Sequence, residues 1–492
     1  MSKFPEASSQ EEYPMHRRDF LFGSFHILLR TTDTPPGPLH FVVLKSDEHN
    51  PRYSSVYGHP FVRTPHMERL ARMGTVFENH YTPSPLCRPA RSAWMSGRYV
   101  HTIQCYNNCT VFSHNHRTYA QVLRAQGVHT VHIGKTDAYR PAHQLGFSEM
   151  LHPIDRPPPG DTYISRQPLD IRDDSTTRAE GFGVRPDPFA TDDVIIDAAV
   201  RWLTEVAPKI PGPWTLDVNI NAPHFPHYVT QELWDLYPQG ADLSPLGPGE
   251  ASAQHPYAQD LRTHFRTETF TEAQIRGLRR GYLGCVTAAD RQLGRLLDAI
   301  EATGLHRTTV VAYTSDHGEM LGKFGLWWKS SLYEDAARTP LIVAGPGFAA
   351  GTRVQTPTTL LDLQAAMFHA LGARRPRGWK GHPLQLLPAR DARRTVFLEY
   401  HGHGTRASAF AIRRGPWKLI YYAAAPHQLF NLEADPEEQK NLADTLPDRK
   451  RELERELRRI CDPERENQRA EAFLQRELAA IRAHDRSEQE LP

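Results

Sequence analysis

The stretch Ser84-Pro85-Leu86-Cys87-Arg88-Pro89-Ala90-Arg91-Ser92-Ala93-Trp94-Met95-Ser96-Gly97-Arg98, residues 84–98, joins a predicted strand to a predicted helix. Pro89 suits the first turn of that helix, because its missing backbone N–H would have no partner there. We therefore place Cys87 at or just before the helix N-terminus, where free N–H groups and the helix dipole favour an anion. Arg91 adds a positive charge one turn later. The stretch predicts a site for phosphate or sulfate beside Cys87.

The same stretch resembles the first signature of the type I sulfatases of the alkaline phosphatase superfamily. That signature is Cys-x-Pro-x-Arg, followed by a helix of small residues and Gly-Arg. In this family a formylglycine-generating enzyme oxidises the cysteine to formylglycine, whose hydrated aldehyde is the nucleophile. The resemblance implies that fate for Cys87. The competing interpretation is a small buried hydrophobic residue at a turn, which is the usual state of a free cysteine.

Acidic residues follow two other predicted strands, residues 39–44 and 309–315. Open α/β sheets place their sites beyond the carboxyl ends of parallel strands, so we expect these residues to meet at one edge. Mostly oxygen donors suit Ca²⁺ or Mg²⁺, and the family resemblance favours Ca²⁺, bound also by the modified cysteine. The predicted metal ligands are Asp47, Glu48, Cys87, Asp316 and His317.

The predicted strand at residues 128–133 leads to Gly134-Lys135-Thr136-Asp137. Sulfatases commonly have Gly-Lys-x-His here, with the lysine on the sulfate. The replacement of histidine by Asp137 resembles the glucuronate 2-sulfatase branch, which contains arylsulfatase K. The resemblance implies that Lys135 binds sulfate and that Asp137 accepts a proton. Beside an anion, the pKa of Asp137 should rise unless Lys135 or the metal compensates.

Three further positions complete the predicted site. Residues 223–226, Pro-His-Phe-Pro, resemble the family's Pro-His-x-Pro turn, which implies that His224 contacts the sulfate and the leaving oxygen. His227 is a poorer second choice. Lys329 matches a lysine that follows the second pair of metal ligands in these enzymes. His401 lies between two predicted strands, where selecting the substrate and forming a plain surface turn both remain open.

The resemblance implies a two-step reaction. One hydroxyl of hydrated formylglycine attacks sulfur in line and the alcohol leaves; the second hydroxyl then loses its proton, and elimination of sulfate regenerates the aldehyde. Arg91, Lys135, Lys329 and the metal would stabilise charge on the transferring group. His224 would protonate the leaving oxygen. The leading substrate class is a sulfated uronic acid or related glycan, as in glycosaminoglycan degradation.

The order of predicted elements indicates an α/β fold with a large, mixed, mostly parallel sheet flanked by helices. From residue 395, short strands separated by turn residues predict a smaller antiparallel sheet. We expect a leader at 1–38, a catalytic domain at 39–390, the antiparallel sheet within 391–445 and a charged helix at 446–492. Residues 151–191 and 227–269 are predicted to be irregular insertions that select the substrate.

The 492-residue chain has 58 basic and 57 acidic residues, and a net charge of +1 argues against binding nucleic acid by bulk charge. No apolar run reaches the length of a membrane span. Five cysteines do not form a disulfide framework. Residues 16–23 resemble a twin-arginine export signal, but the apolar stretch after them is short, so cytoplasmic and exported locations both remain open.

Three rival functions remain. Phosphonate monoester or phosphodiester hydrolases share the formylglycine, but often have an acid followed by Gln where this chain has Asp47-Glu48. A choline sulfatase would need an aromatic or acidic box for the quaternary ammonium group. A catalytically inactive glycan-binding protein would result if Cys87 were never oxidised.

Overall fold

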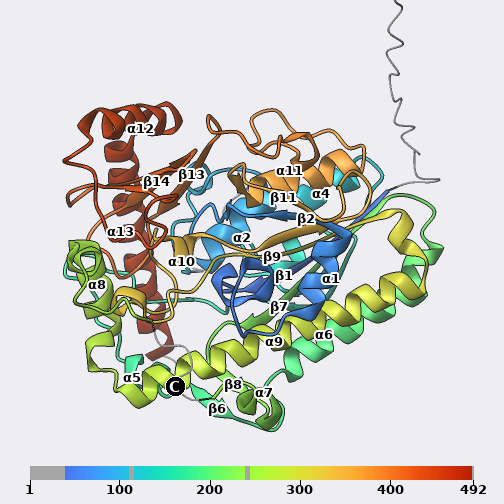
Figure 1. Cartoon of the computed structure of the whole chain (residues 1–492), viewed down its shortest axis with the longest axis horizontal. Helices are drawn as coiled ribbons and strands as arrows, with labels where there is room; N and C mark the ends of the chain where they lie inside the picture. The colour runs from blue at the N-terminus through green and yellow to red at the C-terminus, as the bar shows by residue number, and fades with distance from the viewer. Residues whose placement is uncertain (1–38, 110–115, 239–243, 490–492) are drawn as a thin grey trace, which may run out of the picture. The chain divides into compact units, whose positions relative to one another are not determined.

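The computed structural model describes residues 39–109, 116–238 and 244–489; the predicted leader lies outside this range. Eight strands form the central sheet (Figure 1). From edge to edge they are β11 (Thr352–Val354), β2 (Gly74–Phe77), β10 (Leu341–Ala344), β9 (Thr309–Ser315), β1 (His40–Asp47), β7 (Trp214–Pro223), β4 (His129–Lys135) and β5 (Glu149–Ile154). Of these eight, β10 alone runs antiparallel to its neighbours. This confirms the predicted mostly parallel sheet.

Helices cover both faces of the central sheet (Figure 1). One face, which includes Val42 and Leu44 of β1, packs on α1 (Pro65–Met73), α6 (Ala190–Arg201) and α9 (Glu272–Ala302). The other face, with Phe41 and Val43, packs on α2 (Cys87–Ser96), α4 (Tyr119–Arg124) and α11 (Leu360–Ala370). Burial on both faces explains why the central strands are continuous apolar runs rather than alternating ones.

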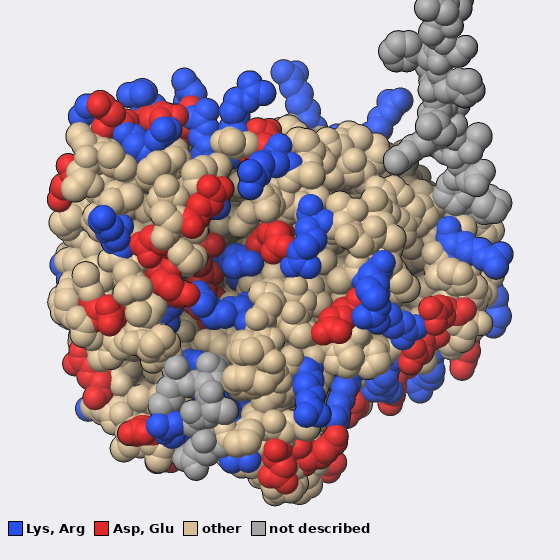
Figure 2. All heavy atoms as spheres, viewed as in Figure 1, with Lys and Arg blue, Asp and Glu red and all other residues tan. Residues whose placement is uncertain are grey.

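A separate antiparallel sheet follows, as predicted. Its strands are β13 (Thr395–Tyr400), β14 (Ala409–Arg414), β15 (Trp417–Tyr422) and β16 (Gln428–Asn431), paired in chain order. Helix α12 (Pro447–Ile460) packs on this sheet through Leu453 and Leu457. Basic and acidic side chains are interspersed over the face drawn in Figure 2, in keeping with the balanced composition.

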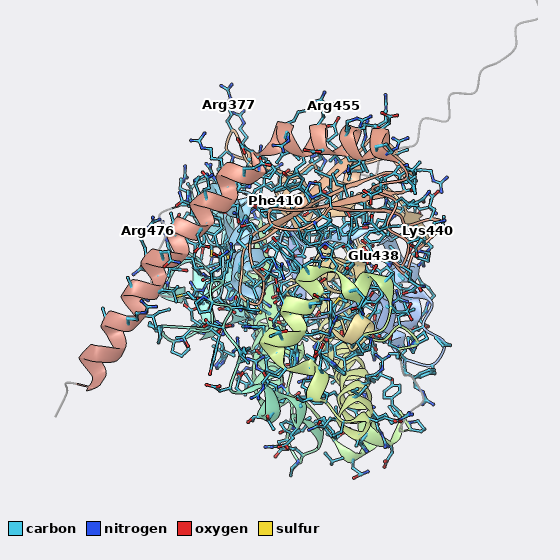
Figure 3. The ribbon with its side chains drawn as sticks, turned by 90° about the vertical axis from the view of Figure 1, so that its left-hand side faces the viewer. Arg377, Phe410, Glu438, Lys440, Arg455 and Arg476 are labelled. Atoms are coloured by element: carbon cyan, nitrogen blue, oxygen red, sulfur yellow. The ribbon has the colours of Figure 1, made fainter. Side chains whose placement is uncertain are left out.

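The tail predicted as one helix forms two, α12 and α13 (Pro463–Gln489). Cys461 is extended, and Pro463 can only begin a helix, so the first helix ends before it. Figure 3 shows Arg455 of α12 and Arg476 of α13 on the outside of these helices, with Phe410 inside the antiparallel sheet. No helix within the described ranges is long and apolar enough to cross a membrane.

The two insertions predicted to be irregular contain short elements. The first runs from β5 through α5 (Ser175–Ala179) and β6 (Phe182–Val184), and the second holds β8 (His227–Val229), α7 (Gln231–Asp235) and α8 (Pro256–Phe265). Strands β6 and β8 pair in parallel, which ties the insertions together. The strand predicted before residues 84–98 is two strands, β2 followed by β3 (His80–Tyr81), and β3 pairs with β12 (Thr358–Thr359). Helices α3 (Val100–Ile103) and α10 (Glu334–Ala337) complete the fold. Elements this short carry too little periodicity to be read from sequence.

Candidate active site

Four neighbouring parallel strands bring predicted site residues to one edge of the central sheet. Strand β1 ends at Asp47, β4 ends at Lys135, and β9 and β7 lead directly into Asp316 and His224. Cys87 is the first residue of α2, in agreement with its predicted place at a helix N-terminus. The parallel topology therefore collects residues that are far apart in sequence.

Cys87 is fully buried among charged side chains. Its Sγ atom lies 3.2 Å from Nε2 of His317, 3.3 Å from Nζ of Lys329 and 4.0 Å from Oδ1 of Asp47. Burial and Asp47 raise the pKa of the thiol, but Lys329, Lys135 and His317 outweigh them and hold that pKa well below its ordinary value. The surroundings of Cys87 thus stabilise negative charge at this position.

A cluster of metal-ligating groups surrounds Cys87. The ligand atoms of Asp47, Cys87, Asp316 and His317 all lie within 4.8 Å of one another. Arg91 joins the two carboxylates, with NH2 2.9 Å from Asp47 Oδ2 and Nε 2.7 Å from Asp316 Oδ2. The two carboxylates and the imidazole of this cluster supply mostly oxygen donors, which fit a hard divalent cation.

Glu48 lies beside this cluster with one oxygen bound and one free. Its Oε2 atom lies 2.9 Å from Nζ of Lys329 and 3.1 Å from Nε2 of His224, whereas Oε1 is buried without a hydrogen-bond partner. Burial raises the pKa of Glu48, but Lys329 and His224 lower it to about 2. Burial and Glu48 raise the pKa of Glu319 well above its usual value. A cation or a proton on Glu319 would satisfy the free oxygen of Glu48.

His224 and Lys329 contact each other at the mouth of the site. Lys329 Nζ lies 2.8 Å from Nε2 of His224, and Nδ1 of His224 lies 2.6 Å from the carbonyl oxygen of Phe225. The imidazole also stacks on the Phe225 ring, with centroids 4.4 Å apart. The His224 side chain is 19% exposed, more than the side chain of any residue that contacts Cys87, so it can reach an incoming ligand.

Asp137 is held by arginines. Arg156 binds its two oxygens through Nε and NH2, and Arg88 Nε lies 3.9 Å away. Burial raises the pKa of Asp137, but Arg156, Lys135 and Arg88 lower it well below its usual value. Lys135 thus lowers the pKa of Asp137 as the sequence predicted, and Arg156 and Arg88 lower it further. A carboxylate held in this way is a weak base, which disfavours the predicted proton-accepting role.

Two histidines considered from the sequence are not brought to this cluster. His401 is buried, with Nδ1 2.8 Å from Ser408 Oγ and Nε2 2.8 Å from Glu399 Oε2, so both ring nitrogens are engaged. His227 begins β8, and its Nδ1 lies 3.1 Å from the carbonyl oxygen of Leu278. The turn between β13 and β14 folds His401 back into the antiparallel sheet.

Three residues near the site were missed by the sequence interpretation. Asn219 Oδ1 accepts from Arg91 NH1 at 2.9 Å, and its only signal was a polar residue inside an apolar strand. Arg156 and Arg178 come from the first insertion, where no pattern distinguishes them from other arginines. Arg156 reaches the site through Asp137, because its Nε and NH2 atoms bind the two oxygens of that carboxylate.

Comparisons with known proteins agree with this geometry. The model of the family described as Sulfatase matches residues 40–373, and that of the N-sulphoglucosamine sulphohydrolase C-terminal family matches residues 322–465. Choline-sulfatase of Rhizobium meliloti (strain 1021) is 33% identical over 404 residues, which cover 78% of each chain. Arylsulfatase K of Danio rerio is 30% identical over 462 residues, or 86% of this chain and 84% of the relative.

Among solved structures, the phosphonate monoester hydrolase of Agrobacterium radiobacter is similar with a TM-score of 0.65 and 20% identity, over 86% of this chain and 95% of that one. At that identity the likeness concerns the fold alone. The Sulfatase model, by contrast, spans more than half of the chain and includes the strand ends and the Cys87 helix. The chain therefore belongs to the sulfatase family, with its alkaline-phosphatase-like fold, and is a sulfatase that hydrolyses sulfate esters.

Proposed function

We propose that this sulfatase acts through a formylglycine made from Cys87 by a formylglycine-generating enzyme. The observation that carries the proposal is the setting of Cys87, which opens a buried helix with His317 and Lys329 at 3.2 and 3.3 Å from its sulfur. Hydrated formylglycine would supply a hydroxyl nucleophile and a second hydroxyl for release of sulfate.

The chain's own cations would bind and orient the sulfate. Lys135 and Lys329 approach the nucleophile from β4 and from the segment after β9, and Arg91 lies behind both carboxylates. Fixed positive charges in a buried site stabilise developing negative charge without reorganisation. His224, the most open of these groups, would hold the proton for the leaving oxygen.

Asp47, Glu48, Asp316 and His317, with the modified Cys87, would hold a divalent cation, and the oxygen-rich donor set favours Ca²⁺, with Mg²⁺ as the alternative. When bound, the cation would supply positive charge that lowers the pKa of the nucleophile and screens one sulfate oxygen. We assign Asp137 a positioning role, because Arg156 occupies both of its oxygens.

The leading substrate class is a 2-O-sulfated uronic acid or related glycan rather than choline sulfate. A quaternary ammonium group needs an open aromatic face. The His224 ring stacks on Phe225, which packs against Trp328. The guanidinium carbon of Arg178 lies 4.4 Å from the Phe225 ring centroid and 5.4 Å from that of Trp328. Arg178 is paired with Asp174 at 2.8 Å. Its guanidinium group covers these aromatic faces against choline, and its remaining N–H groups could donate to a substrate carboxylate or second sulfate.

Two measurements test this proposal. The tryptic peptide that contains Cys87, taken from protein purified from its own host, should be lighter by about 18 mass units than the unmodified peptide, as conversion of thiol to aldehyde requires. Cys87→Ala should fold normally by circular dichroism and lose turnover. An unmodified thiol in fully active protein would contradict the mechanism.

Substrate preference is measured separately. We expect kcat/KM to be highest for a 2-O-sulfated glucuronide and lower for choline sulfate, a phosphonate monoester and a phosphodiester. Preference for choline sulfate would overturn the substrate class and leave the formylglycine mechanism in place. Preference for a phosphorus ester would support the phosphonate or phosphodiester hydrolase alternative.

A further inference from the structure

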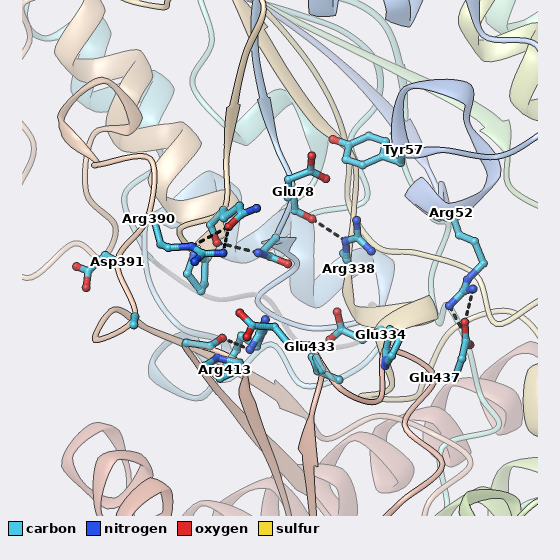
Figure 4. Close-up of a pocket in the computed structure, with 18 residues that line it drawn as sticks. Arg52, Tyr57, Glu78, Glu334, Arg338, Arg390, Asp391, Arg413, Glu433 and Glu437 are labelled. Carbon is cyan, nitrogen blue, oxygen red and sulfur yellow. Dashed lines mark hydrogen bonds and ion pairs between the residues drawn. The ribbon is translucent and has the colours of Figure 1, made fainter.

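A second charged cavity, of about 690 Å³, lies between segments of the central and antiparallel sheets (Figure 4). Its walls come from the segments after β1 and β2, from α10 and the residue that follows it, from the loop before β13, from the β14–β15 turn and from the segment after β16. None of the residues that contact Cys87 lines it. Figure 2 shows basic and acidic side chains gathered around a hollow on this face.

Three arginines in this cavity bind neutral acceptors. The Nε atoms of Arg338, Arg390 and Arg413 donate to a backbone carbonyl oxygen at 2.8 Å, a glutamine side-chain oxygen at 2.8 Å and a tyrosine hydroxyl at 3.0 Å. Within the described residues, none of the three forms an ion pair with a carboxylate. Figure 4 shows them on different sides of the cavity. No described carboxylate therefore occupies the N–H groups of these guanidinium groups, and a bound anion could accept hydrogen bonds from them.

Most carboxylates of the cavity are already paired. Glu78 binds Arg353, Glu437 binds Arg52 at 2.7 Å, and Glu334 binds Lys418 at 2.9 Å. The exceptions are Asp391 and Glu433, to which no side chain within the described residues donates a hydrogen bond. Burial lowers the pKa of Arg413, but Tyr81, Glu334 and Glu433 lie near enough to raise it. Burial raises the pKa of Glu334, but Lys418, Arg413 and Arg338 lower it. None of these described carboxylates binds one of the three arginines directly.

The floor of the cavity is fixed in place. Arg413 is 4% exposed, and its Nε donates to the hydroxyl of Tyr81. That hydroxyl in turn donates to Glu334 at 3.0 Å. Lys418 lies 2.9 Å from both Glu334 and Glu438. A guanidinium group held by such a network loses little conformational entropy when an anion binds.

We propose that this cavity is a second binding site, for the sulfate or carboxylate group of an acidic sugar. Arg338, Arg390 and Arg413 would bind the anionic group, because guanidinium groups match planar and tetrahedral oxyanions. Asp391 and Glu433 would accept hydrogen bonds from sugar hydroxyls. The choice of an acidic sugar as the ligand rests on the proposed function, in which the substrate is a sulfated glycan. This cavity would bind a different sugar unit from the one whose sulfate lies at Cys87.

Crystallography with selenate, an anomalous sulfate analogue, tests the anion site directly. Selenate should bind between the three arginines in Cys87→Ala protein, in addition to any ion at the nucleophile. Arg338→Gln/Arg390→Gln and the single variant Arg390→Gln should lose that peak, whereas Arg393→Gln, an exposed change of equal charge outside the cavity, should keep it. Absence of selenate from the cavity of the otherwise unchanged Cys87→Ala protein would overturn the proposal.

Calorimetry in the Cys87→Ala background, which cannot turn substrate over, tests the occupant. A 2-O-sulfated uronate disaccharide should bind at two sites per chain, and the double arginine variant should weaken one of them at least about ten-fold. If inorganic sulfate binds in the cavity but the disaccharide does not, the assignment of a sugar as the ligand is wrong. Failure of the formylglycine mass test would leave both outcomes unchanged, so the two proposals fail separately.

Discussion

Arg156 binds both carboxylate oxygens of Asp137, at 3.2 and 3.0 Å. The pair joins the first insertion to the end of β4, the strand that carries Lys135. Burial raises the pKa of Asp137, but Arg156, Lys135 and Arg88 lower it well below its usual value, which favours the ionised carboxylate. This geometry underlies the positioning role proposed for Asp137.

Asp137→Asn should therefore lower kcat/KM only about ten-fold and leave the acidic limb of the pH–rate profile in place. Loss of a general base would instead reduce kcat by about 10² or more and remove that limb. A pH series of initial rates distinguishes these outcomes. Arg156→Gln is the matched variant, and it should raise KM for an acidic substrate more than KM for an uncharged aryl sulfate.

His224 should matter most when the leaving group is poor. A sugar alkoxide needs a proton as it departs, whereas a nitrophenolate does not, so the loss of a general acid is felt by the first kind of substrate. His224→Ala should reduce kcat about 10²-fold for a sugar sulfate and much less for a nitrophenyl sulfate. His306→Ala, at an exposed histidine, is the control. Equal losses on both substrates would assign His224 to sulfate binding alone.

Removal of the cation should affect both activity and stability. The ligand atoms of Asp47, Asp316, Cys87 and His317 all lie within 4.8 Å of one another. A cation that binds them in the folded state would stabilise that state by mass action. Dialysis against a chelator should abolish turnover and lower the Tm, and Ca²⁺ should restore both. Glu48→Gln should weaken Ca²⁺ about ten-fold, as measured by calorimetry. Unchanged affinity would remove Glu48 from the ligand set.

The sequence was enough to predict the residues around Cys87, but not the arginines that the first insertion brings to the site. Asp47 and Asp316 follow long apolar runs, and parallel strands bring their carboxyl ends to one edge whatever the strand order. The order of the strands itself depends on non-local pairing, which no local pattern encodes. Arg156 and Arg178 lie in an insertion without periodicity, and His401 points inward because of how the β13–β14 turn folds.

Asp335 provides the last prediction, which concerns stability. Asp335 accepts hydrogen bonds from Lys323 Nζ at 2.8 Å, Arg52 Nε at 3.0 Å and Asn50 Nδ2 at 2.9 Å. Burial raises the pKa of Asp335, but Lys323 and Arg52 lower it well below the ordinary value of 3.8. Because the folded-state pKa lies below the unfolded one, the carboxylate stabilises the fold above about pH 4 and loses that contribution as the pH falls further.

Asp335→Asn should lower the free energy of unfolding by about 3 kcal/mol near pH 7, because it leaves buried Lys323 without its closest partner. The difference from the unchanged protein should narrow as the pH falls below about 4, where Asp335 becomes protonated in the unfolded chain. Urea unfolding at a series of pH values measures this difference. Asp444→Asn, at an exposed aspartate, should stay within about 0.5 kcal/mol throughout. A difference that does not depend on pH would mean that the asparagine acts through packing and not through the lost charge.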